Sequence, residues 1–322
     1  MDILLTNIQS PVILFFLLGV FAGLVKSDLE IPSMMAKGVA LYMIAAIGLK
    51  GGLAISEKSI DSALILLILS GVILGFVLPF IGNFFLRRTS DLGPIDTAAI
   101  AGHYGSVSLV TFIAASEFLR AQTGNPASGE FIALLAFMES PAILAALVMA
   151  APHIGKRARA RRKSEIAREV FLNGTMVLLL GSMLIGYITP ESEISSIKSV
   201  FVEPFKGVLC FFLLDMGINI GRRFKDLTSL QKPVFAFAFY MPLISSVIAL
   251  GVSALLGLDP KDAFLFLVLS SSASYIAVPA ALKIALPEAN PALYTSLPLA
   301  LTFPFNIALG IPLYYWMAGL LG

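Results

Sequence analysis

The chain has 322 residues, of which 58% are hydrophobic and 13% charged, with a mean hydropathy of +0.91 and a net charge of +2. A soluble globular domain has about 45–50% apolar and about 25% charged residues. The composition therefore excludes an ordinary soluble domain and predicts a membrane protein, and we expect no nucleic-acid partner.

Ten apolar segments along the chain are candidates for membrane spans, each of which needs roughly 20 apolar residues. Eight of them contain almost no charge, and they cover residues 3–25, 62–86, 97–116, 131–155, 170–190, 233–258, 263–282 and 289–322. Two more, residues 33–55 and 200–220, are apolar but carry internal charges. The sequence therefore predicts an all-α membrane protein with ten transmembrane helices.

The first span is not expected to be a cleaved signal peptide, because Asp2 precedes it and no Lys or Arg does. Cys210 is the single cysteine, so an intrachain disulfide is impossible and the redox compartment stays open.

The 22 Lys and Arg residues divide unequally between the two sets of loops. The odd connections, which join spans 1 to 2, 3 to 4 and so on, hold 16 of them, and the even connections hold 6. Because short cytoplasmic loops carry the excess of positive charge, we expect the odd connections in the cytoplasm and both termini outside.

The densest basic cluster lies between spans 5 and 6, in residues 155–169. Its seven Lys and Arg side chains can set the topology and contact anionic membrane lipids. The same loop could instead dock a soluble regulatory protein, and composition leaves both interpretations open.

The two halves of the chain share short motifs at a nearly constant spacing, called here the repeat spacing. Pro94-Ile-Asp96 recurs as Pro260-Lys-Asp262, and Ser106-Val-Ser108 corresponds to Ser272-Ala-Ser274 at the same distance along the sequence. Since each half holds five spans, an odd number, the second copy enters the bilayer with inverted topology. We expect a first five-helix repeat in residues 1–154, a basic cytoplasmic linker in 155–169 and a second five-helix repeat in 170–322. Inverted repeats are typical of secondary transporters, although channels and membrane enzymes can also arise by duplication.

Spans 4 and 9 occupy the same repeat position and are both poor continuous helices. Residues 101–108 read Ala-Gly-His-Tyr-Gly-Ser-Val-Ser, and residues 270–279 contain four serines and end at Pro279. Proline removes an amide donor and disfavours helix just before it. We therefore predict that both helices are broken near the midplane, where transporters of this kind bind substrate.

Broken helices expose backbone amides, which together with serine hydroxyls suit a small oxyanion. The candidate substrate-binding residues are Gly105, Ser106, Val107 and Ser108 in span 4, with Ser272, Ala273, Ser274 and Tyr275 in span 9. The alternative is that the small residues only allow close helix packing and that the serines bond to carbonyls of their own helices.

Glu139 lies inside span 5, close to Pro141, and an ionisable residue within a span is a functional candidate. Na⁺ would neutralise this carboxylate as a coupling ion, with Ser108 and Ser271 as candidates for further oxygen ligands. Proton binding is one alternative, and a protonated, hydrogen-bonded structural carboxyl is another. His103 could carry a proton or act as a hydrogen-bonding spacer.

An enzyme is not expected. The chain has two histidines, no His-Glu-x-x-His motif and no nucleotide-binding glycine loop. Gly102-His-Tyr-Gly-Ser106 has the spacing of a serine-nucleophile turn, but no strand precedes it. The classes that remain are an ion-coupled transporter of a small organic or inorganic anion and an anion channel.

Over nearly its whole length the chain resembles the sodium-dependent bicarbonate transporter family first described in cyanobacteria. The similar motifs are Gly48-Leu-Lys-Gly-Gly52, Gly102-His-Tyr-Gly-Ser-Val-Ser108, Phe137-Met-Glu-Ser-Pro-Ala142, the serine run 270–274 and Leu286-Pro-Glu-Ala-Asn-Pro291. The resemblance implies a gate domain of spans 1, 2, 6 and 7, a core domain of spans 3–5 and 8–10, and a homotrimer in a bacterial plasma membrane. It also implies sodium-coupled uptake, with bicarbonate between the half-helices of spans 4 and 9.

Two positions depart from the cyanobacterial pattern. Tyr275 follows the span 9 serines where that pattern has Asp, and the span 5 carboxylate is Glu139 instead of Asp. The loop at 155–169 is also shorter than in cyanobacterial members, where a soluble trimeric signalling protein docks. We expect sodium-dependent bicarbonate uptake, and docking of that protein is not carried over.

Overall fold

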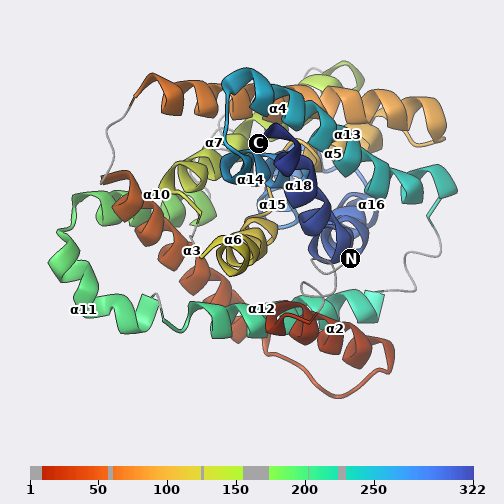
Figure 1. Cartoon of the computed structure of the whole chain (residues 1–322). Coiled ribbons are helices and arrows are strands. Elements are labelled where there is room, and N and C mark those ends of the chain that lie inside the picture. Colours follow the sequence, from red (N-terminus) through yellow and green to blue (C-terminus); the bar gives the residue numbers. More distant parts are fainter. Residues whose placement is uncertain (1–8, 57–60, 125–126, 155–173, 202, 224–229) are drawn as a thin grey trace.

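The structure is a computed structural model that describes residues 9–56, 61–124, 127–154, 174–201, 203–223 and 230–322 (Figure 1). Every regular element in these ranges is helical, and they contain no strand. The basic linker expected at 155–169 lies outside the described residues, as do the first residues of spans 1 and 6.

Among the described residues, the first half contains six α-helices and a short 3₁₀ turn. They are α2 (Pro11–Leu24), α3 (Ser33–Ser56), α4 (Ser62–Thr89), α5 (Pro94–His103), α6 (Leu109–Thr123), α7 (Gly129–Ala150) and η1 (Ala151–His153). Side-chain caps define where several helices begin. At the start of α4, the Leu64 amide donates to Asp61 Oδ1 over 2.9 Å. Since such a cap satisfies an amide that has no partner inside the helix, the helix begins there.

The second half is also helical in its described residues. Its elements are α10 (Gly174–Ile188), α11 (Glu191–Phe201), α12 (Phe205–Arg223), α13 (Lys232–Leu256), α14 (Pro260–Ser271), α15 (Ala277–Ala285) and a last run from α16 (Pro291–Ser296) through η3 (Leu297–Thr302), α17 (Phe303–Phe305), η4 (Asn306–Gly310), α18 (Ile311–Ala318) and η5 (Gly319–Leu321). The sequence did not predict α11. In the last run, η3 and η4 are π-helical, as expected where Pro298, Pro304 and Pro312 interrupt the hydrogen-bond ladder.

Five helical stretches among the described residues are long and apolar enough to cross a membrane. They are Ser33–Ser56, Ser62–Thr89, Gly129–His153, Lys232–Leu256 and Pro291–Leu321. Two shorter apolar helices, Pro11–Leu24 and Gly174–Ile188, match predicted spans 1 and 6. The remaining spans coincide with short or more charged helices, so the count of ten stays a prediction.

The long helices present apolar side chains outward. On α4, Leu66, Ile73 and Phe84 are each more than half exposed, while the opposite face of the same helix packs against α7. An outward apolar surface of this kind suits contact with lipid tails, which are as apolar as the side chains themselves.

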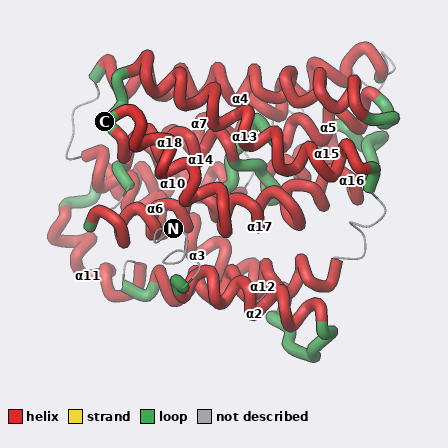
Figure 2. The backbone as a smooth tube through the Cα atoms, turned by 45° about the vertical axis from the view of Figure 1, so that its right-hand side comes forward, coloured by secondary structure: helices red, strands yellow, loops and turns green. Residues whose placement is uncertain are grey.

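Helices α2 and α12 pack through glycines, and both lie at the same edge of the molecule in two views (Figures 1 and 2). A Cβ atom added to Gly19 would lie 2.2 Å from a carbonyl oxygen of α12, and one added to Gly217 would lie 2.3 Å from a carbonyl oxygen of α2. One turn later, Gly23 and Gly221 approach the opposite backbone as closely. Because the contacts advance along both helices together, α2 and α12 run parallel.

Helices α3 and α10 pack in the same way. A Cβ atom added to Gly52 would lie 1.9 Å from the Met183 carbonyl oxygen, and one added to Gly186 would lie 2.3 Å from the Leu49 carbonyl oxygen. Small residues at this spacing let two backbones approach in a membrane.

The glycine contacts recur at repeat-related positions. Each of the four helices has two small residues four apart, at 19 and 23, 48 and 52, 182 and 186, and 217 and 221. The motifs of α3 and α12, and likewise those of α2 and α10, are separated by close to the repeat spacing. Exchanging the two halves therefore turns the α2–α12 pair into the α10–α3 pair, which supports the predicted duplication.

This packing gives a stability prediction with a matched control on the same helix. Gly217→Ala places a methyl group against the α2 backbone, so the melting temperature in detergent should fall by roughly 5 °C or more. At Gly207 an added Cβ meets nothing within 4 Å, and Gly207→Ala should leave the melting temperature equal or higher because alanine favours helix. Equal stability of the two variants would contradict the close α2–α12 contact.

Candidate functional site

Two breaks in the helices, residues 104–108 and 272–276, lie against each other. Helix α5 ends at His103 and α6 begins at Leu109, while α14 ends at Ser271 and α15 begins at Ala277. The Ser274 amide donates to the His103 carbonyl over 3.0 Å, and His103 Nδ1 bonds to the Ser274 carbonyl. Since a carbonyl oxygen can only accept, Nδ1 carries the proton.

A third hydrogen bond joins the breaks on the other side. The Ser108 amide donates to Ser272 Oγ over 2.8 Å, and the Ser272 hydroxyl donates to the Leu269 carbonyl over 2.9 Å. The two breaks are thus held together by His103 at one point and by Ser272 at another.

A serine in each break accepts a hydrogen bond from an amide in the first turn of the helix that follows. Ser108 Oγ accepts from the Thr111 amide over 3.2 Å, and Ser274 Oγ accepts from the Val278 amide over 3.4 Å. Ser108 and Ser274 are related by the repeat spacing. The Thr111 hydroxyl also donates to Ser108 Oγ over 2.9 Å.

Both helix N-termini border one small cavity, called here the shared cavity. It is lined by Val107, Ser108, Leu109, Glu139, Thr175, Ser274, Tyr275 and Ile276. About 20 Å³ of it is open to the centre of a water molecule, and a water needs roughly 10–15 Å³ of such space. The cavity can therefore hold water or a small polar group next to two helix N-termini, which favour negative charge.

Glu139 brings a carboxyl group to the same cavity from α7. Its side chain is 8% exposed. Pro141, two residues later, lacks the amide hydrogen that would bond to the Phe137 carbonyl. A carboxyl group in such a place is either protonated or, when ionised, paired with a cation.

Several buried polar atoms near the breaks have no hydrogen-bond partner among the described residues. They are His103 Nε2, Ser106 Oγ, Ser270 Oγ, Ser271 Oγ and the Tyr275 hydroxyl. Buried polar groups are almost always paired, so this concentration points to a place that a ligand or water completes. The Tyr275 ring packs edge-on against Phe303 with centroids 5.2 Å apart.

Most of the predicted residues lie at the shared cavity or in the breaks beside it. Val107, Ser108, Ser274 and Tyr275 line the shared cavity together with Glu139, and Ser106, Ser272 and Ala273 belong to the two adjoining breaks. Ser271 is the last residue of α14, next to the second break. Its carbonyl accepts from Asn306 Nδ2 over 3.0 Å, and it does not line the cavity that contains Glu139.

Gly105 has a positional role. A Cβ atom there would lie 2.3 Å from Pro79 Cγ and 2.4 Å from the Gly75 carbonyl oxygen. The absence of a side chain thus lets the first break rest directly on α4.

The family model described as the Na⁺-dependent bicarbonate transporter superfamily matches residues 11–319. The chain belongs to this superfamily. No curated protein matches the chain. Membership identifies this member of the superfamily as a multi-pass membrane protein of a transporter family, and it confirms the resemblance seen in the motifs.

In this superfamily member the last helical run also anchors the breaks, which sequence reasoning missed. The Tyr104 and Thr302 hydroxyls are 2.7 Å apart, and the Thr302 hydroxyl donates to the Ala238 carbonyl over 2.9 Å. Asn306 fixes the end of α14 and accepts at Oδ1 from the Tyr314 hydroxyl over 2.8 Å. Thr302 and Asn306 are the only polar residues between 297 and 313, and that isolation is the signal that could have identified them.

A sodium site can be tested against these residues. Among the described residues, no three His, Cys, Asp or Glu side chains gather in a metal-binding group. Transporters of this architecture coordinate Na⁺ largely through carbonyls of unwound helix segments, so one carboxylate beside two breaks fits that chemistry. Glu139 and Ser108 share the cavity and are the side chains that would hold the ion.

Proposed function

We propose that the chain is a sodium-coupled secondary transporter that takes up a small oxyanion, with bicarbonate as the leading substrate. The observation that carries this proposal is the shared cavity, bordered by the N-termini of α6 and α15 and by Glu139. Amide groups at helix N-termini and serine hydroxyls donate to the three oxygens of such an anion. The cation at Glu139 balances the negative charge and couples uptake to the sodium gradient.

The helix pairs supply the moving parts in this proposal. Helices α2, α3, α10 and α12 form the gate domain. Helices α4 to α7 and the elements from α13 to the end of the chain form the core domain that carries both breaks. The 1–154 and 170–322 repeats give the two pseudo-symmetric conformations that alternating access needs. A homotrimer in a bacterial plasma membrane completes the proposal, with the gate domains held together and the core domains free to move.

The direct test is uptake of labelled bicarbonate into proteoliposomes, with and without an inward sodium gradient. Gradient-driven accumulation supports the proposal. Accumulation of a different small anion would keep the mechanism and change the cargo, because amides and serines accept any small oxyanion. Flux that ignores the gradient and never accumulates substrate would indicate an anion channel.

Removing either capping serine should weaken anion binding. Ser108→Ala or Ser274→Ala deletes a hydrogen bond to a charged ligand, worth about 1.5–3 kcal/mol, so KM should rise roughly tenfold to a hundredfold. Glycine at the same positions tolerates the cap conformation but also lacks the hydroxyl, and should raise KM as much. Asp61→Ala removes the cap of α4, which does not border the cavity, and should leave KM unchanged. An unchanged KM in either serine variant contradicts a two-sided site.

The orientation can be tested at the basic loop. A cysteine introduced at Ser164, in a chain whose native Cys210 has been replaced, should react with an impermeant thiol reagent only after the membrane is made permeable. Reaction in intact cells would reverse the topology expected from the distribution of basic residues.

A further inference from the structure

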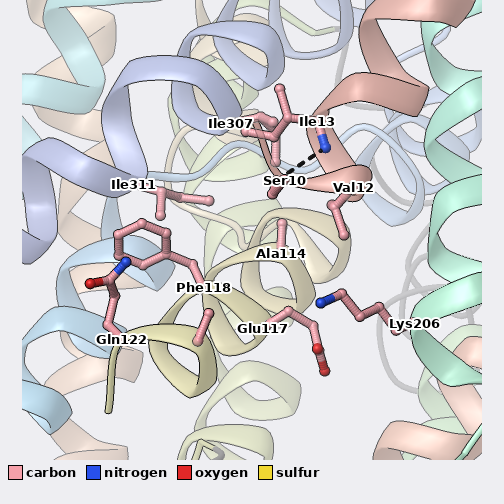
Figure 3. Close-up of a pocket in the computed structure, with 11 residues that line it drawn as sticks. Ser10, Val12, Ile13, Ala114, Glu117, Phe118, Gln122, Lys206, Ile307 and Ile311 are labelled. Carbon is pink, nitrogen blue, oxygen red and sulfur yellow. Dashed lines mark hydrogen bonds between the residues drawn. The ribbon is translucent and has the colours of Figure 1, made fainter. Parts of the chain in front are cut away.

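A second cavity, called here the α6 cavity, lies along the C-terminal half of α6 (Figure 3). About 60 Å³ of it is open to the centres of water molecules, room for several waters or a small hydrated ion. Its walls come from the beginnings of α2 and α12, represented by Ser10 and Lys206, and from α6 and the last helical run, represented by Gln122 and Ile307. It therefore lies between the helices proposed as gate and those proposed as core.

The charged side chains that line this cavity are Lys206 and Glu117. The Lys206 and Glu117 side chains reach the same end of it from α12 and α6 (Figure 3). Lys50 of α3 lies within electrostatic range of Glu117 and Arg120, and its Nζ stands 4.2 Å from the centre of the Phe205 ring, next to Lys206. Lys206 and Lys50 thus lie near one carboxylate, and the net positive charge that this leaves beside a cavity large enough for water favours an anion.

The α6 cavity and the shared cavity border the same helix, α6. Its inner wall includes Ala114, six residues from Ser108, a distance of about 9 Å along the helix axis. If successive spans alternate in direction, one side of the membrane holds the starts of α2 and α12 and the end of α6. The distribution of basic residues predicts that this side is outside. The shared cavity is lined in part by Thr175 at the start of α10. By the same alternation α10 starts on the cytoplasmic side, so one edge of the shared cavity lies toward the cytoplasm.

We propose that the α6 cavity is a capture site for small oxyanions, where Lys206 and Lys50 bind the anion before it reaches the helix N-termini. This inference rests on the proposed transport of an oxyanion. A lysine ammonium on a flexible stem acts as a point charge, and a cleft with one sign of charge raises the local concentration of the opposite ion. Glu117 keeps the affinity low enough for the anion to leave toward the breaks.

The positive potential can be measured without transport. Gln122→Cys is introduced in a Cys210→Ala background, and the purified full-length protein in detergent is treated with an anionic sulfonate or a cationic trimethylammonium methanethiosulfonate reagent. Gln231→Cys, at an exposed position between α12 and α13, is the matched control. Relative to this control, the cysteine at position 122 should prefer the anionic reagent by roughly fivefold, and Lys206→Ala should remove most of the preference. If Cys210→Ala lowers stability, native Cys210 is kept and its own reaction rate is subtracted.

Bicarbonate then tests binding. Sodium bicarbonate should slow the reaction at position 122, while sodium gluconate at equal ionic strength should not, and because no lipid is added the effect cannot come from a headgroup. Equal slowing by both salts, or no preference for the anionic reagent, would overturn the capture site even if transport itself is demonstrated.

Transport kinetics distinguish capture from a mechanical latch between Lys206 and Glu117. Capture predicts that Lys206→Ala raises KM for bicarbonate at low ionic strength with the maximal rate preserved, that Lys206→Arg restores KM, and that Glu117→Gln lowers KM. If both neutralising variants instead reduce the maximal rate with KM unchanged, the pair is a latch and the capture site is refuted.

Discussion

Glu139→Gln is expected to move the sodium dependence of transport to a concentration at least tenfold higher while the protein still folds. Glutamine keeps the size of the side chain and removes its charge, and an apolar surrounding cannot replace a lost ligand charge. A difference of one order of magnitude corresponds to about 1.4 kcal/mol, which is modest for a carboxylate that contacts a cation. The measurement is the initial uptake rate as a function of sodium concentration at fixed labelled anion.

The control for this prediction is Glu193→Gln, an exposed acidic residue of α11, which should leave the sodium curve in place. A structural Glu139 that stays protonated gives the opposite result, because glutamine is nearly isosteric with the neutral acid. The curve would then be unchanged, and Glu139 would have no part in coupling.

Tyr275→Asp is the companion experiment to this prediction, because it restores the carboxylate of the cyanobacterial pattern. Tyr275 lines the shared cavity beside Ser108 and Glu139, so the new carboxylate would face the same space. Stronger or more cooperative sodium dependence would mean that the tyrosine replaces an ion site. If the substitution only abolishes transport, the ring against Phe303 shapes the anion pocket, and a substrate other than bicarbonate is then favoured.

The positions of the breaks could be predicted from local chemistry. Gly105, Ser106 and Ser108 are poor residues for the middle of an apolar helix, and the structure ends α5 and begins α6 on either side of them. The same holds for the serines before α15. In both places the signal was local, because caps and helix termination depend on residues within one turn.

The connections between the breaks could not be predicted, because they depend on residues far apart in the sequence. The bond from the Ser108 amide to Ser272 Oγ spans 164 positions, and nothing in either motif specifies its partner. Ser271 and Ser272 are neighbours in a run of serines, yet only the rotation of α14 decides that Ser272 faces the other break and that the Ser271 carbonyl faces Asn306. The expectation that Ser271 shares an ion with Glu139 therefore depended on information that the sequence pattern does not contain.

The sequence contains a signal for the pairing of α2 with α12 and of α3 with α10, namely two small residues four positions apart in each helix. The glycine spacing in each helix marks a close contact, although it does not name the partner helix. The repeat constrains the identity of the partner helix, because exchanging the two halves of the chain converts one helix pair into the other. Helix α11 had no comparable signal, because it lies between spans and carries charged residues.

His103→Gln is expected to raise KM for the anion, whereas His103→Asn should preserve it. His103 is fully buried and holds the second break by donating from Nδ1 to the Ser274 carbonyl and accepting the Ser274 amide at its own carbonyl. The amide nitrogen of asparagine occupies the place of Nδ1, while that of glutamine occupies the place of Nε2. Only asparagine can keep the bond to Ser274.

The size of the effect follows from the carbonyl left without a donor. An unsatisfied buried acceptor costs about 1–3 kcal/mol, so a displaced Ser274 should raise KM roughly fivefold to a hundredfold in the glutamine variant. The same variant can lose stability for general reasons, and melting temperatures of both variants are therefore measured beside KM. A proton-carrying histidine would behave differently, since neither amide titrates and both variants would lose the pH dependence of transport together. If asparagine raises KM as much as glutamine at equal stability, His103 does not position the second break through Nδ1.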